Sequence, residues 1–92
     1  MTQPKPVRVT LAGVLADLFP GAPRHLEVEA DSVRGLIDAL DRRWPGMRDR
    51  ICDTRPAIRR HMNVFVDGER CGLEATLEPG AQVHILTAIS GG

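Results

Sequence analysis

The residues of this chain that could do chemistry are two cysteines, three histidines and a glycine pair at the end of the sequence. Cys52 and Cys71 lie far apart, and neither belongs to a CxxC pair, so their spacing does not indicate a zinc site. The N-terminal MTQPKPVRV lacks the apolar core of a secretion signal. We therefore expect a cytoplasmic protein in which both cysteines are reduced thiols without a functional role.

The histidines are His25, His61 and His84. An imidazole can serve as a metal ligand or general base, but such a role needs further ligands or a nucleophile at a suitable spacing. None of the three is followed or preceded by such a partner at a recognisable spacing. We expect solvent-facing histidines and no bound metal.

Gly91 and Gly92 offer another kind of site, because the reacting group would be the carboxylate of the final residue and not a side chain. Glycine has no Cβ, so the pair can pass through a narrow channel and adopt backbone angles closed to other residues. Glycines are also common at unstructured chain ends, so the pair needs support from its context. That support is a terminal strand of apolar residues directly before it.

Composition excludes several classes of function. A chain of 92 residues has room for one domain with a modest core. Twelve basic residues balance twelve acidic ones, so no overall charge would attract nucleic acid or a membrane surface. No segment approaches the roughly 20 apolar residues that a membrane helix needs. We expect neither nucleic acid nor membrane as a partner.

The first half of the chain predicts two strands and one helix. Apolar and polar residues alternate over 7–11 and again over 26–30, which is typical of strands with one buried face. Asp31 and Ser32 are suitable N-caps for a helix whose apolar stripe runs from Val33 to Trp44, and Pro45 ends it. A short helical turn is expected over 47–52.

The second half predicts a basic loop over 53–60, a strong strand over 62–66, a tight turn at Asp67 and Gly68, and a last strand over 82–87. Alternation in the two strands assigns their faces. Met62, Val64, Val66, Val83 and Ile85 would face the helix, and Asn63, Phe65, His84 and Leu86 the opposite side. Phe65 and Leu86 would then be exposed apolar groups leading to the tail.

Together these elements predict an α+β domain in which one main helix packs on a mixed sheet of four to five strands. In the β-grasp form of this arrangement the first and last strands are central and parallel. We expect a flexible N-terminus over 1–6, a β-grasp domain over 7–88 and a flexible tail over 89–92 that ends in Gly-Gly.

Three segments resemble the MoaD/ThiS family of ubiquitin-like sulfur carriers, which includes the small subunit of molybdopterin synthase. They are NVFVDGER from Asn63, the turn EPGAQVHIL, and the terminal ISGG. The resemblance spans Val7 to Gly92 and implies a β-grasp fold whose terminal Gly-Gly is adenylated and then converted to a thiocarboxylate. Ser90 stands where many relatives carry alanine and Thr87 where proline is frequent, which weakens a direct link to molybdopterin.

By this resemblance the chain is a protein cosubstrate and not an enzyme. Gly92 would carry the adenylate and thiocarboxylate, with Gly91 as part of the tail, and Phe65, Leu86, Ile89 and Ser90 would contact partners. No cofactor would be bound, since ATP is used by the activating partner. The implied partners are an E1-like adenylyltransferase or sulfurtransferase and an acceptor, either a synthase subunit or another biosynthetic enzyme.

Two alternatives to a sulfur carrier share this sequence pattern. A protein modifier would join Gly92 to a lysine of a target, although Lys5, the only lysine, argues against chains built on internal lysines. An interaction domain would use the same fold with an inert tail. Within the carrier hypothesis, the acceptor pathway stays open among molybdopterin, cysteine, thiamine and related sulfur metabolites.

Overall fold

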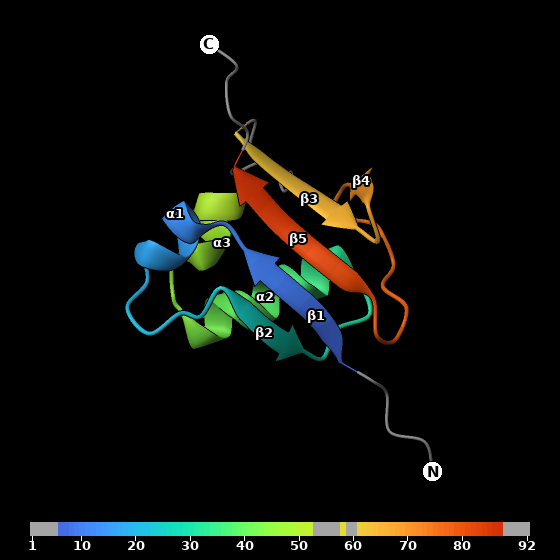
Figure 1. Ribbon diagram of the computed structural model, residues 1–92, viewed down its shortest axis with the longest axis horizontal. Coiled ribbons are helices and arrows are strands. Elements are labelled where there is room, and N and C mark those ends of the chain that lie inside the picture. Colours follow the sequence, from blue (N-terminus) through green and yellow to red (C-terminus); the bar gives the residue numbers. More distant parts are fainter. Residues whose placement is uncertain (1–5, 53–57, 59–60, 88–92) are drawn as a thin grey trace.

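The computed structural model describes residues 6–52, 58 and 61–87. Within these residues the chain forms a single five-stranded mixed sheet and three helices, as expected for an α+β domain (Figure 1). In chain order the elements are β1 (Val7–Leu11), α1 (Gly13–Asp17), β2 (His25–Val28), α2 (Val33–Arg43), α3 (Met47–Ile51), β3 (Met62–Val66), β4 (Glu69–Cys71) and β5 (Gln82–Thr87). No helix in these segments is long and apolar enough to cross a membrane.

The two ends of the described chain meet in the middle of the sheet. The strand order is β2-β1-β5-β3-β4, in which β1 and β5 are parallel neighbours and every other pair is antiparallel (Figure 1). Val9 of β1 lies opposite Val83 of β5. The prediction that the first and last strands are central and parallel is therefore confirmed.

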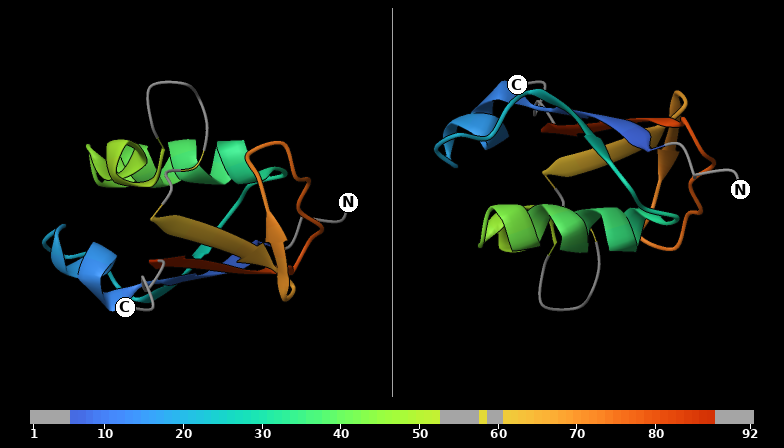
Figure 2. Two further views of the ribbon diagram at one scale, coloured as in Figure 1. Left: turned by 90° about the horizontal axis from the view of Figure 1, so that it is seen from above. Right: turned by 90° about the horizontal axis from the view of Figure 1, so that it is seen from below.

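One face of the sheet carries the core. Figure 2 shows α2 and α3 in one layer and the sheet in the other. The buried apolar residues of both layers form one core cluster. The fully buried large side chains come from these elements: Val7, Val9 and Leu11 of β1, Val64 of β3, Val83 and Ile85 of β5, Val33, Leu36, Ile37 and Leu40 of α2, and Met47 and Ile51 of α3. The apolar stripe predicted for the helix is this buried face.

The start of α2 is held by its own cap and by the segment between β4 and β5. The Ser32 hydroxyl accepts a hydrogen bond from the Gly35 amide at 3.0 Å. The Val33 amide then donates to the Ala75 carbonyl and the Arg34 amide to the Leu73 carbonyl. These contacts satisfy amides that the first turn of a helix leaves without internal partners, so they fix the helix end to a distant part of the chain.

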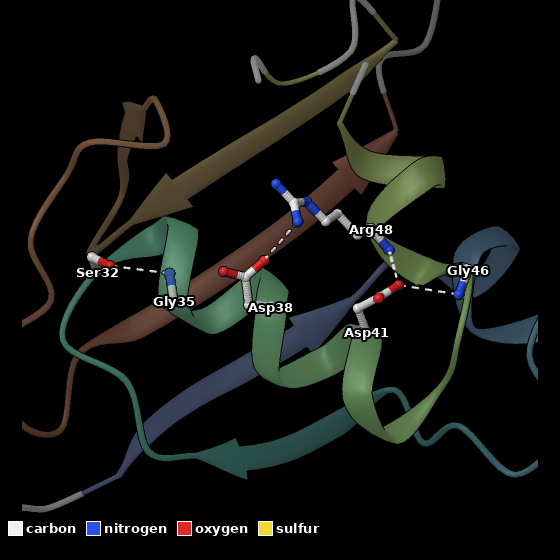
Figure 3. Close-up of polar contacts among 6 residues, drawn as sticks. All are labelled: Ser32, Gly35, Asp38, Asp41, Gly46 and Arg48. Atoms are coloured by element: carbon white, nitrogen blue, oxygen red, sulfur yellow. Dashed lines mark hydrogen bonds and ion pairs between the residues drawn. The ribbon is translucent and has the colours of Figure 1, made fainter. Parts of the chain in front are cut away.

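A single carboxylate organises the connection between α2 and α3. Asp41 Oδ1 accepts hydrogen bonds from the amides of Gly46 and Arg48, each at 3.0 Å (Figure 3). Gly46 has a φ of 101°, a left-handed conformation that residues with a Cβ rarely adopt. The Arg48 side chain also pairs with Asp38, at 3.3 Å. The Asp41 carboxylate of α2 thus caps the start of α3.

The structure differs from the sequence prediction in the first third of the chain. Helix α1 was not predicted, because its five residues are too few to show a helical period and Ala12 provides no side-chain cap. Strand β2 covers 25–28 instead of 26–30. The predicted basic loop over 53–60 lies outside the described residues except for Ile58, which forms an isolated bridge with Cys52.

The Asp41 contacts predict a measurable difference between two neighbouring carboxylates. Asp41→Ala leaves two backbone amides without their acceptor, and we expect the free energy of unfolding to fall by about 1–3 kcal/mol. The control, Asp38→Ala, breaks only an exposed ion pair with Arg48 and should cost less than about 1 kcal/mol. Urea denaturation of both variants measures the difference, and equal losses would contradict the capping role of Asp41.

Candidate functional site

In the sequence, the glycine pair follows β5, a central strand of the sheet, by only a few residues. Strand β5 ends at Thr87, opposite Met62 of β3. Gly91 and Gly92, together with the predicted contact residues Ile89 and Ser90, lie outside the described residues. The described part of the site is therefore the strand that precedes the tail and the surfaces around its end.

Strand β5 is held on both sides. It pairs with β1 over 82–85 and with β3 over 83–87. A strand hydrogen-bonded to two neighbours and buried on one face belongs to the part of a domain that opens only with global unfolding. The point from which residues 88–92 continue is thus fixed relative to the rest of the molecule.

The outer face of β3 and β5 carries the other predicted contact residues. Val83 and Ile85 are fully buried on the inner face, and Leu86 is 37% exposed on the outer face. Phe65 is half-buried, and its partners in the register of the sheet are His84 of β5 and Arg70 of β4. It is therefore less exposed than the alternation predicted.

A polar row continues this face toward β2. The register aligns His25, Thr10 and His84 across three strands, and His25 Nδ1 lies 3.3 Å from Thr10 Oγ1. A shallow depression of about 370 Å³ covers this part of the sheet. The described residues contain no group of three side chains suited to binding a metal ion. The outer face therefore has a polar half over β1 and β2 and an apolar part over β3 and β5.

The two cysteines lie in different parts of the fold. Cys52 is buried at the end of α3, and Cys71 is half-buried on the edge strand β4. The Cys71 thiol donates to the Glu69 carbonyl at 3.3 Å. No disulfide joins these two cysteines in the structure.

Sequence reasoning missed one exposed element beside the tail. Helix α1 follows β1 at the end of the sheet where β5 finishes, and it exposes two apolar side chains, Val14 and Leu18 (Figure 1). The only sequence signal was the apolar character of 14–18, which is equally typical of a buried turn. Its exposure depends on what packs against it, which the local sequence does not record.

Comparison with known proteins agrees with this geometry. The profile of the ThiS family matches residues 9–92. The chain belongs to the ThiS family. The match confirms the resemblance seen in the terminal motifs and, with the sheet order, confirms the ubiquitin-like β-grasp fold. No curated protein sequence matches the chain.

Solved structures of the same fold include CysO proteins and small archaeal modifier proteins. A chain of the BexX/CysO complex from Amycolatopsis orientalis is 29% identical, with a TM-score of 0.82 over 94% of this chain and 99% of that one. SAMP1 from Haloferax volcanii is 25% identical, with a TM-score of 0.77 over 94% and 98%. CysO from Mycobacterium tuberculosis, 24% identical, has a TM-score of 0.82 over 90% and 99%. This ThiS-family chain is thus a small ubiquitin-like protein of the carrier and modifier type.

The two faces of β5 predict opposite responses to the same kind of truncation. Ile85→Ala removes a fully buried side chain, and we expect it to lower the free energy of unfolding by about 2–5 kcal/mol. Leu86→Ala, one position on, should cost less than about 1 kcal/mol because Leu86 faces outward. Chemical denaturation of both proteins provides the measurement. A larger loss for Leu86 would mean that the register of β5 is shifted by one residue.

Proposed function

We propose that this protein is a sulfur carrier whose working group is the carboxyl group of Gly92. A partner enzyme adenylates this group, and sulfur then replaces one of its oxygens. The observation that carries the proposal is the continuity between a ThiS-family β-grasp domain, its central strand β5 and the Gly-Gly at the end of the sequence. The chain is a cosubstrate in this scheme, and its partner supplies the ATP site.

The proposed chemistry needs no side chain of this protein. A carboxylate oxygen of Gly92 attacks the α-phosphorus of ATP, and pyrophosphate leaves, so that the carbonyl carbon carries AMP as a leaving group. Sulfide, as HS⁻, attacks this carbon, AMP leaves, and loss of the proton gives a thiocarboxylate, which is anionic at neutral pH. The thiocarboxylate sulfur then attacks an electrophilic carbon of the acceptor, as thiolates do, and displaces a leaving group from it. Water cleaves the resulting thioester, which leaves the sulfur on the acceptor as a thiol and regenerates the carboxylate of Gly92.

The tail and the fold have separate tasks in this scheme. Gly91 and Gly92 have no side chains that could block a narrow active site, which suits a chain end that must reach ATP inside another protein. Strand β5, paired on both sides, holds the start of the tail in place. Phe65 and Leu86, with Ile89 and Ser90 beyond them, are proposed to contact the partners along the outer face.

The acceptor belongs to sulfur-consuming biosynthesis, with molybdopterin, cysteine, thiamine and related metabolites as the candidate products. One such acceptor is the large subunit of a synthase in which this chain is the small subunit. Similarity to SAMP1 supports a second use, in which activated Gly92 is joined to a lysine of another protein. Both uses begin with the same adenylation and differ in the nucleophile that follows.

The proposal predicts sulfur at Gly92 in the native cell. Trypsin releases Cys71 to Gly92 as one peptide without methionine. Replacing an oxygen by sulfur adds nearly the same mass as an oxidation, so only oxidation of Cys71 could be mistaken for sulfur at Gly92. Tandem mass spectrometry of this peptide, from cells that need sulfur transfer, should place sulfur on Gly92. An unmodified carboxylate throughout would leave the interaction domain as the function, and an isopeptide remnant on another protein would establish the modifier.

The position of the reacting group predicts a strict requirement at the chain end. One alanine added after Gly92 displaces the carboxylate from the activating site, and we expect adenylate and thiocarboxylate formation to be lost completely. The matched control is the same alanine inserted after Met1, which should leave both unchanged. Mass spectrometry of the two proteins from the same cells measures the effect. Activation of the extended chain would contradict a reaction at the terminal carboxyl group.

A further inference from the structure

Few large apolar side chains are exposed in the described part of the chain. They are Val14 at 66% exposure, Leu18 at 50% and Leu86 at 37%. Single exposed apolar residues are ordinary on protein surfaces, but a group of them at one place marks an interaction site. The position of the group on the fold therefore matters more than its size.

The exposed side of α1 is a consequence of how this helix is anchored. Leu15 and Ala16 are buried in the core. Val14 and Leu18 are four positions apart, a spacing that places two side chains on the same side of a helix. With Leu15 and Ala16 committed to the core, that shared side faces solvent.

The location of α1 follows from the parallel pairing at the centre of the sheet. β1 leads directly into α1, and the Ala12 amide, just before the helix, donates to the Ile85 carbonyl of β5 at 2.8 Å. The helix therefore starts beside Ile85, the neighbour of Leu86 in β5, and lies at the end of the sheet where β5 finishes (Figures 1 and 2). All three exposed apolar residues lie at the end of the sheet from which the chain continues to Gly92.

A cation borders this apolar surface. The guanidinium of Arg24 lies against Gly13, where a methyl group would come within 2.0 Å of Nη2. No ion pair involves Arg24 among the residues that the structure describes. An apolar centre with a charged rim is the usual composition of a protein interface. The partner surface that fits it is an apolar concavity with a carboxylate at its margin.

Chain length restricts which partner can lie here. Residues 88–92, fully extended, span at most about 18 Å, so an enzyme acting on Gly92 must approach within that distance of Thr87. Helix α1 starts beside Ile85, two residues before Thr87, so it lies at the end of the molecule that such an enzyme approaches. The enzyme that adenylates Gly92 is needed whether the activated chain gives up sulfur or is joined to a protein, so it is the partner that both uses require.

We propose that Val14 of α1 and Leu18, the C-cap residue of that helix, together with Leu86, form the docking surface for the adenylating enzyme, with Arg24 at its margin. This inference rests on the proposed reaction at Gly92. It adds α1 to the outer face of β3 and β5 as a contact region and assigns it to the activating step. The surface positions the tail and has no part in the bond changes.

The test compares two double variants in the native cell with the partners present. Val14→Ser with Leu18→Ser removes the apolar surface, and the control, Val14→Ile with Leu18→Met, keeps it. At equal protein abundance, we expect the rate at which Gly92 acquires sulfur to fall about tenfold or more in the serine variant and to stay unchanged in the control. Thermal unfolding of both purified proteins checks that the fold is retained. If the serine double variant does not fold, Leu18→Ser alone, which changes the C-cap residue, replaces it.

The loaded fraction of Gly92 separates the outcomes. A fall in the serine variant, with the control loaded like the wild type, supports docking of the adenylating enzyme. An unchanged rate overturns the proposal. A rise in thiocarboxylate also overturns it, because it would mean that the surface serves the acceptor that removes sulfur. If wild-type Gly92 is never adenylated or loaded, the proposed function itself fails, a result distinct from equal loading of wild type and variant.

Discussion

The parallel pairing of β1 with β5 is the constraint on which the rest of this structure depends. It brings the first and last strands of the described chain into the middle of one sheet, where each has a neighbour on both sides. Parallel neighbours cannot be joined by a tight turn, so the intervening chain must cross the sheet. Helices α2 and α3 lie on that crossing and cover the inner face (Figure 2). The same pairing places the end of β5 beside the start of α1.

Polar contacts between different elements hold the helices that lie between β1 and β5 in the chain. The segment after β4 supplies carbonyl acceptors to the first turn of α2, and Asp41 near the end of α2 supplies the acceptor for the start of α3. Each contact satisfies amides that a helix cannot satisfy internally. These contacts hold the helices to the rest of the fold and to each other. None of the described charged side chains is buried.

In the proposed function, this ThiS-family chain carries the reacting carboxyl group, and its partners supply the catalysis. The reacting group proposed here is a carboxylate that every protein chain has, and what distinguishes this chain is how that group is presented. In the proposed function, the central strand β5 sets where residues 88–92 begin, the glycines suit entry into a partner, and the surfaces at the same end of the sheet direct the docking. On this proposal, specificity depends on the docking surfaces, because the terminal glycines carry no side chains for a partner to read.

The sequence by itself determined the features that depend on spacing within one element. Alternation predicted β3 and β5 with their inner faces, the apolar stripe and Ser32 predicted α2, and the terminal motifs indicated the family. Only the tertiary structure decided what depends on contacts between distant segments. It fixed the register of β1 against β5, left Phe65 half-buried, and left Val14 and the C-cap residue Leu18 exposed at a helix too short to show a period. Periodicity records which side of an element is apolar, whereas exposure depends on which other elements cover that side.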